Sequence, residues 1–187
     1  MDDLQQRLRR ARAACNMLST DYRTNWTLEP KPELLKPLVK GQDIIEIGYG
    51  RDGGLAEYFK ELGAGNYLGV DIDGEAFNQS QRYAARNRVY LLDDPIHVLN
   101  NNQNKQSIVV SSAVLEDLII KDTGYLMDLI QAIARHVTKG TPTIHLSGYI
   151  EAMNPLFANE GLMPQKGCPE FLCVYERTEP TPSLPLQ

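Results

Sequence analysis

The sequence predicts a single α/β domain whose sheet is mostly parallel and doubly wound, with helices on both faces. Short apolar runs typical of buried strands alternate with longer segments whose apolar residues recur at helical spacing. Because parallel strands need a crossover connection, usually a helix, this alternation favours a parallel sheet. The chain has 187 residues, of which 42% are hydrophobic, and this size and composition fit one globular domain.

Residues 1–28 predict an N-terminal helical extension that we expect to serve as a lid. Its apolar residues fall three or four positions apart on one helical stripe: Leu4, Leu8, Ala11, Cys15, Leu18 and Tyr22. Arginines crowd the first turns, at Arg7, Arg9, Arg10 and Arg12. We interpret this arginine run as a solvated face, and docking of an anionic partner is the alternative. Prolines at positions 30 and 32 disfavour helix, so we expect the extension to end there.

The rest of the domain, residues 29–177, alternates strands with helices. Short apolar runs predict strands at residues 43–47, 66–72, 88–92, 107–112, 143–146 and 170–177. Helical spacing of apolar residues predicts helices at 53–62, 75–86, 125–137 and 151–158. The third of these is the clearest, because Leu126, Leu129, Ile130 and Ile133 fall on one face. We expect a surface loop at the polar run 100–104 and a flexible tail at 178–187, which holds three prolines.

Composition and charge restrict the partners and the compartment. The formal net charge of −5 argues against a broad surface that neutralises nucleic-acid phosphates. The three cysteines lack the CxxC spacing of zinc sites and are interpreted as reduced thiols of a cytoplasmic protein. The three histidines show no ligand spacing, so no metal site is expected. With no secretory leader and no apolar run of the roughly 20 residues that span a bilayer, no membrane association is expected.

The most informative motif follows the first predicted strand and reads IIEIGYGRDGG over residues 44–54. Glycines at the carboxyl end of a strand allow a tight turn and let a ligand approach the backbone closely. About twenty residues later, Asp71 ends the second predicted strand with a carboxylate that can accept hydrogen bonds from both hydroxyls of a ribose. Together these features predict a cofactor that contains adenosine.

Two classes of cofactor fit this motif. Gly48, Gly50 and Gly53 match the dinucleotide pattern GxGxxG, with Asp71 at a suitable distance. Glu46, however, would present a carboxylate of the wrong charge to a pyrophosphate. Its position suits a ligand that carries an ammonium group, which a carboxylate can bind through a charge-assisted hydrogen bond.

Three stretches resemble class I S-adenosylmethionine-dependent methyltransferases, in the family's order. EIGYG at residues 46–50 and GVDID at 69–73 resemble the first two motifs, and VVSSAVLEDL at 109–118 resembles the fourth strand and its loop. The resemblance covers residues 34–177 and implies a Rossmann-like methyltransferase fold with S-adenosylmethionine as cofactor. The sequence departs from the family at Asp52, which stands where a third glycine is usual, as if one residue had been added.

The resemblance implies cofactor-binding roles for ten residues at or after strand ends: Glu46, Gly48, Tyr49, Gly50, Asp71, Ile72, Asp93, Asp94, Ser112 and Ala113. The first four would hold the methionine portion, Asp71 the ribose, and Ile72 the adenine. Asp93 or Asp94 would lie near the adenine amino group, and the last two residues would line the floor. Considered without the family, the stretch Asp93-Asp94-Pro95 is typical of a helix cap.

In-line methyl transfer depends mainly on positioning two reactants and needs a base only when the acceptor must lose a proton. The catalytic candidates at this edge of the sheet are Tyr49, Glu116 and His145. The candidates for substrate or lid contacts are Tyr22, Trp26 and Asp117. Each has a structural alternative. A histidine inside a strand is commonly a core residue, and aromatic residues four apart suit helix packing.

The sequence therefore predicts S-adenosylmethionine-dependent methyl transfer to a small molecule or to a protein side chain. The loop after the fourth strand lacks the proline-rich motif with which amino methyltransferases grip a nucleic-acid base, which disfavours nucleic acid as substrate. A short lid would leave an open site that suits a protein side chain, or a small molecule closed in by a partner subunit of a homo-oligomer. Two other functions stay open: a non-catalytic binding or scaffold subunit, and an NAD-dependent oxidoreductase.

Overall fold

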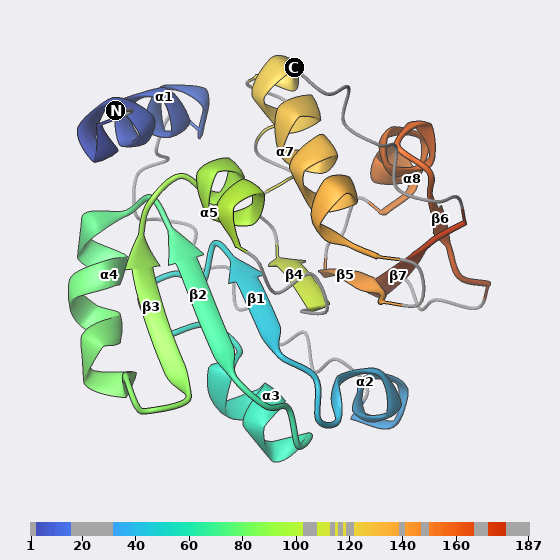
Figure 1. The fold of residues 1–187 in the computed structure, drawn as a ribbon, viewed down its shortest axis with the longest axis horizontal. Helices are drawn as coiled ribbons and strands as arrows, with labels where there is room; N and C mark the ends of the chain where they lie inside the picture. The colour runs from blue at the N-terminus through green and yellow to red at the C-terminus, as the bar shows by residue number, and fades with distance from the viewer. Residues whose placement is uncertain are drawn as a thin grey trace.

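Seven strands form one sheet in the order β3-β2-β1-β4-β5-β7-β6 (Figure 1). The computed structural model describes residues 3–15, 32–102, 108–112, 115, 118, 122–138, 141–146, 150–166 and 172–178. The strands are β1 (Ile44–Ile47), β2 (Tyr67–Asp71), β3 (Arg88–Leu92), β4 (Ile108–Ser112), β5 (Thr143–Leu146), β6 (Leu162–Pro164) and β7 (Leu172–Arg177). The first five pair in parallel, whereas β7 runs antiparallel to both β5 and β6. The mostly parallel, doubly wound sheet is therefore confirmed.

Helices cover both faces of the sheet, and an apolar cluster fills the space under each set. The helices are α1 (Leu4–Cys15), α2 (Pro32–Val39), α3 (Ala56–Glu61), α4 (Gly74–Ser80), α5 (Pro95–Asn101), α7 (Thr123–His136) and α8 (Ile150–Asn159). Side chains of α2, α3 and α4 join the cluster on one face. Those of α1, α5, α7 and α8 join the cluster on the other face, which is turned toward the viewer in Figure 1. All four residues of β1 are buried, as expected for a strand covered on both sides.

The helix α2 corrects the expectation that the prolines near position 30 mark a helix-free break. Pro32 is the first residue of α2, where a missing N–H costs no intrahelical hydrogen bond and a fixed φ suits the helix. Leu35 and Val39 lie one turn apart and are fully buried, so packing stabilises this short helix. Pro37 lies inside it, within the first two turns.

Three other boundaries differ from the sequence predictions. The helix predicted over 75–86 ends at Ser80 and continues only as a 3-10 turn, Gln81–Tyr83. Asn100 and Asn101 belong to α5 rather than to a surface loop, because Asp94 caps a helix that begins at Pro95. The short outer strand β6 was not predicted, since three residues are too few to show alternation.

The strongest packing lies beneath α7 and α8. Eight of the fourteen residues of α7 are buried, which confirms its predicted apolar face. Phe157 of α8 stacks on Tyr175 of β7 with ring centroids 4.2 Å apart. The Arg177 guanidinium donates a hydrogen bond to the carbonyl of Ala134, which ties the last strand to α7. No helix in the described part of the chain combines the length and apolar character that a bilayer span requires.

Candidate cofactor site

The site is built around Asp71, the last residue of β2, at the carboxyl edge of the sheet. Its Oδ2 accepts a hydrogen bond from the N–H of Gly50 at 2.8 Å, and its Oδ1 accepts one from the N–H of Asp73 at 2.9 Å. Burial raises the pKa of the Asp71 carboxyl above its usual value, and these two N–H donors offset part of that rise. Asp71 therefore joins the loop after β1 to the loop after β2.

The loop after β1 begins with glycines in a backbone conformation that other residues rarely adopt. Gly48 and Gly50 have φ angles of 76° and 66°. The N–H of Gly48 donates to the carbonyl of Val70 at 2.8 Å, so the start of the loop stays aligned with β2. A Cβ placed on Gly50 would meet no atom within 4 Å. The backbone at Gly50 is thus open on the side where a side chain would otherwise stand.

Glu46 lies inside β1 and fixes the far end of the same loop. It is 1% exposed, and its Oε2 accepts hydrogen bonds from the Tyr67 hydroxyl at 2.6 Å and from the N–H of Leu55 at 2.8 Å. Burial, and then the charge of Glu46, raise the pKa of Tyr67 well above its usual value. The carboxylate therefore anchors the loop where it meets α3. The contact with the methionine portion that the resemblance implies stays a prediction.

A cleft opens beside Asp71 on the face covered by α5 and α7. It is lined by Ile47, Gly48, Val70, Asp71, Ile72, Pro95, Leu118, Tyr125 and Leu129. Its enclosed volume is small, about 20 Å³, and reaches about 290 Å³ only when the open solvent at the mouth is included. The cleft brings together three of the predicted cofactor residues, namely Gly48, Asp71 and Ile72. One carboxylate in a largely apolar wall suits a ligand with a flat apolar part and hydroxyl groups.

The two aspartates after β3 have different environments. Asp93 accepts hydrogen bonds from Arg7 of α1, with Nε 2.9 Å from Oδ1 and Nη2 3.0 Å from Oδ2. Asp94 is 3% exposed and caps α5, since its Oδ1 accepts from the N–H of Ile96 at 2.9 Å and from the Tyr125 hydroxyl at 2.8 Å. The structural alternative is therefore confirmed for Asp94 as a helix cap.

Two catalytic candidates lie away from the cleft. Tyr49 packs against Tyr90 with ring centroids 5.0 Å apart, within the cluster under α3 and α4 on the opposite face of the sheet. Burial raises its pKa to about 12, and its hydroxyl lies 3.4 Å from the Leu91 carbonyl, to which it donates. His145 is fully buried in β5 against Phe157 of α8, at a ring distance of 6.1 Å. Strand alternation turns it toward α8, so the structure favours the core interpretation for His145. The Tyr49 side chain also packs in the core, away from the cleft, and does not support its candidacy as a catalytic residue.

The remaining candidates lie at or after the end of β4 or within residues 16–31. Ser112 is the last residue of β4, and its backbone is paired with Leu146 of β5. The candidates outside the described residues are Ala113, Glu116, Asp117, Tyr22 and Trp26. In the part of the chain that the structure describes, no three metal-ligating side chains gather into a cluster.

The arginines of α1 make contacts around the site that the sequence did not reveal. The Arg12 Nε donates to the carbonyl of Ile72 at 2.8 Å, and Arg10 Nη2 pairs with Asp128 of α7 at 2.5 Å. With the Arg7–Asp93 pair, these contacts show that three of the four arginines bind other parts of the chain. Arg9 and Arg10 are exposed, as a solvated face predicts, whereas Arg7 and Arg12 are partly buried.

Comparisons with known proteins point to one kind of relative. No family model matches the chain. The chain is 31% identical over 107 residues to the ribosomal protein L11 methyltransferase of Dictyoglomus thermophilum, which aligns 57% of this chain with 35% of that protein. It is 29% identical over 130 residues to the protein of the same name from Thermosipho africanus, which aligns 70% of this chain with 46% of that protein. The chain thus spans less than half the length of these curated relatives.

Solved structures share the fold. One is a chain of the complex between the Haloferax volcanii Trm112 methyltransferase activator and a methyltransferase, with a TM-score of 0.58 and 14% identity over 76% of this chain and 85% of that one. At this identity the match shows the fold alone. Together the comparisons confirm the fold class and the resemblance that the three motifs predicted.

Proposed function

We propose that this chain, which resembles the class I S-adenosylmethionine-dependent methyltransferases in sequence and in fold, binds S-adenosylmethionine in the cleft beside Asp71 and transfers its methyl group. The observation that carries the proposal is the position of the Asp71 carboxylate. Asp71 is the last residue of β2 and lines the cleft. Its carboxylate accepts a hydrogen bond from the N–H of Gly50, in the glycine loop after β1. In open parallel sheets, ligands bind at the carboxyl ends of the strands, which is the edge where Asp71 lies.

The residues of the cleft fit an adenosine-containing ligand. Asp71 has two oxygens, each with two acceptor positions, and the backbone N–H groups of Gly50, Asp73 and Ile72 hydrogen-bond to them. Ribose hydroxyls would donate hydrogen bonds to the acceptor positions of the Asp71 carboxylate that remain. A Cβ on Gly50 would enter open space, so the glycine loop leaves room for a ligand against the backbone. Ile72, Pro95 and Tyr125 supply apolar surface for a purine ring.

When bound, S-adenosylmethionine would supply an electrophilic methyl group on a positively charged sulfur. The chain's contribution is then to bind and orient. Asp71 would bind the ribose hydroxyls and so fix the position of the ribose. The apolar side chains of Ile72 and Pro95 would exclude water from one side of the purine ring. Precise positioning of two reactants is sufficient for much of the acceleration of an in-line displacement. Among the described residues, neither Tyr49 nor His145 lines the cleft; Glu116, the third candidate base, lies outside them.

The acceptor in this proposal is a protein side chain, with a small molecule as the alternative. Both curated relatives are named as methyltransferases of a ribosomal protein, which favours a protein acceptor. The matched chain from Haloferax volcanii belongs to a complex with a methyltransferase activator, which supports a protein partner. The acidic composition, with a net charge of −5, argues against nucleic acid.

Calorimetric titration with S-adenosylmethionine, S-adenosylhomocysteine and NAD tests the proposal. We expect binding of the two sulfur compounds and none of NAD. Asp71→Ala should weaken that binding by about 1–3 kcal/mol, because ribose hydroxyls would lose a buried acceptor. Asp43→Ala is the matched control, since Asp43 accepts two hydrogen bonds from Asn66 at the opposite edge of the sheet. Binding of NAD alone would favour an oxidoreductase, and binding of none of the three would favour a scaffold.

A further inference from the structure

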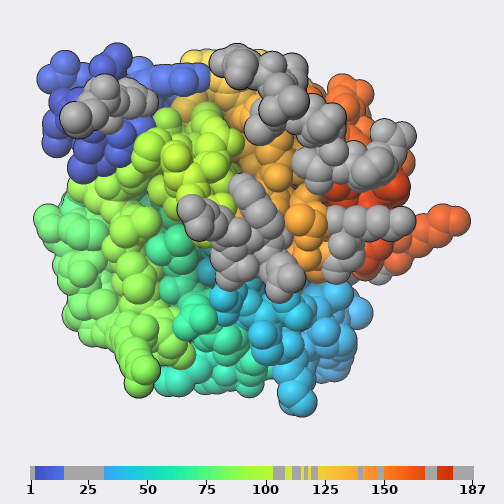
Figure 2. Space-filling view, viewed as in Figure 1, coloured from blue at the N-terminus to red at the C-terminus, as the bar shows by residue number. Residues whose placement is uncertain are grey.

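The helix α1 packs next to the cleft without lining it. It lies at the carboxyl edge of the sheet beside α5, and its atoms reach those of α7 (Figures 1 and 2). Leu8, Ala11 and Ala14 form its inner face and are at most 4% exposed. Ala11 and Ala14 belong to the same apolar cluster as Tyr125 and Leu129, which line the cleft. The inner face of α1 is therefore part of the core around the site.

The arginines of α1 reach both rims of the cleft. On one rim, Arg12 donates to the carbonyl of Ile72, the residue after Asp71. On the other rim, Arg10 pairs with Asp128 of α7, one residue before the cleft-lining Leu129. This second pair is exposed, with 61% and 50% of the two side chains accessible, so its contribution is small.

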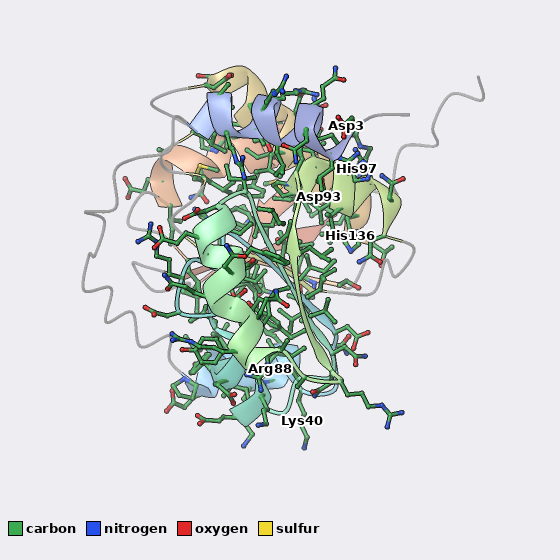
Figure 3. All side chains as sticks on the ribbon, turned by 90° about the vertical axis from the view of Figure 1, so that its left-hand side faces the viewer. Asp3, Lys40, Arg88, Asp93, His97 and His136 are labelled. Atoms are coloured by element: carbon green, nitrogen blue, oxygen red, sulfur yellow. The ribbon has the colours of Figure 1, made fainter. Side chains whose placement is uncertain are left out.

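The Arg7–Asp93 pair is the strongest of these contacts. The guanidinium binds both carboxylate oxygens, and the two side chains are only 13% and 17% exposed. Two parallel charge-assisted hydrogen bonds fix the orientation of the Arg7 guanidinium as well as its distance from the Asp93 carboxylate. Asp93 follows β3, two residues before the cleft-lining Pro95, and Figure 3 shows it at the end of β3 beneath α1. Arg7 thus holds α1 to the strand end next to the cleft.

The same carboxylate is tied into the loop that forms one wall. Asp93 Oδ1 also accepts the N–H of Asp94 at 2.8 Å, and Asp94 caps α5 and accepts the Tyr125 hydroxyl. The backbone N–H of Asp93 donates to the carbonyl of Asp71 at 3.1 Å. A continuous set of hydrogen bonds therefore runs from Arg7 through Asp93 to Asp71 and to the wall residue Tyr125.

We propose that Arg7 is a positioning residue for the cofactor: its two-pronged pair with Asp93 holds α1 beside the cleft, so that α1 docking and ligand binding strengthen each other. The proposal rests on the proposed function of the cleft. Coupling between two binding events is reciprocal, so a ligand that gains affinity from docked α1 must stabilise the docked helix by the same factor. This reciprocity separates a positioning role from a purely structural one.

The test combines calorimetry of S-adenosylhomocysteine with hydrogen exchange of the α1 amides, on the full chain. In the unsubstituted protein, the ligand should slow exchange over residues 4–15, because it suppresses local opening of the helix. Arg7→Gln should weaken ligand binding about ten-fold, within the roughly 5- to 150-fold range usual for coupled sites, and should abolish the slowing. Arg7→Lys should give an intermediate affinity, since an ammonium cannot form the two-pronged pair.

Arg9→Gln is the matched control. It removes the same charge from the same helix at an exposed position, and Arg9 makes no ion pair with any of the described residues. Its ligand affinity should equal that of the unsubstituted chain. If Arg7→Gln binds the ligand as tightly as Arg9→Gln, or if the ligand leaves α1 exchange unchanged in the unsubstituted chain, the proposal is overturned. If the unsubstituted chain binds no ligand at all, it is the proposed function that fails.

Discussion

Replacing Gly54 with alanine should destabilise the fold far more than the same change at another glycine of similar backbone conformation. Gly54 has a φ of 63° and lies where the glycine loop meets α3. A Cβ there would lie 2.6 Å from the Glu46 carboxylate and 2.8 Å from the Tyr67 hydroxyl. Both atoms belong to a buried hydrogen bond that holds the loop, so neither can move without weakening it.

The expected cost is the sum of two effects. A side chain in the left-handed region costs about 1–2 kcal/mol. Overpacking a tight interior site costs a further 1–3 kcal/mol or so. Gly54→Ala should therefore lower the free energy of unfolding by about 2–5 kcal/mol. Gly41→Ala isolates the first effect, because Gly41 has a φ of 74° and a Cβ there would meet no atom within 4 Å.

Urea denaturation of both variants measures the difference. Gly41→Ala should lose about 1–2 kcal/mol, and Gly54→Ala about 1–3 kcal/mol more. With about 2–4 °C per kcal/mol for a domain of this size, melting temperatures should separate in the same order. Equal losses for the two variants would show that the contacts around Gly54 relax freely, and the account of Glu46 as the anchor of the loop would be wrong.

Three further predictions concern the core and the buried tyrosines. Tyr67→Phe should destabilise by about 1–3 kcal/mol in urea denaturation, because the buried Glu46 carboxylate loses a donor at 2.6 Å, and an unchanged stability would count against that role. Phe157→Ala should cost about 3–5 kcal/mol, since the fully buried ring stacks on Tyr175, and a loss below 1 kcal/mol or so would contradict the packing. Burial raises the pKa of Tyr49 to about 12, so the unfolded state loses its proton first. Stability should then fall as the pH rises above roughly 10, by up to about 3 kcal/mol from this group, and Tyr49→Phe should reduce that fall.

The sheet could be predicted from the sequence because each buried strand carries its own signal. β1 is apolar on both faces apart from Glu46, so a run of only four residues is enough to indicate a buried strand. α2 and α5 have eight and seven residues, and their stability comes from packing and from the Asp94 cap rather than from a long periodic pattern. The prolines around the start of α2 therefore indicated a break, and the polar residues at the end of α5 indicated a loop.

The candidate site also contains residues that the sequence predicted and residues that it did not. Gly48 and Asp71 belong to motifs whose spacing is local, and the structure places both at the cleft. Arg7 and Arg12 contact partners 86 and 60 positions away, and no pattern around the arginines indicates which carboxylate or carbonyl they meet. The face to which Tyr49 points could not be predicted, because it follows a strand at a turn, where alternation no longer determines the direction of a side chain.

The two outer strands of the sheet differ in how they would respond to a high protein concentration. An open strand edge is a template for pairing with another molecule. β6 has only three residues and ends in Pro164, which has no N–H to offer, so growth of the sheet on that side is blocked. β3 is longer, with five residues, and its Val89 side chain is 47% exposed. Aggregation that proceeds by strand addition should therefore begin at β3, and Val89→Lys is the substitution that should suppress it.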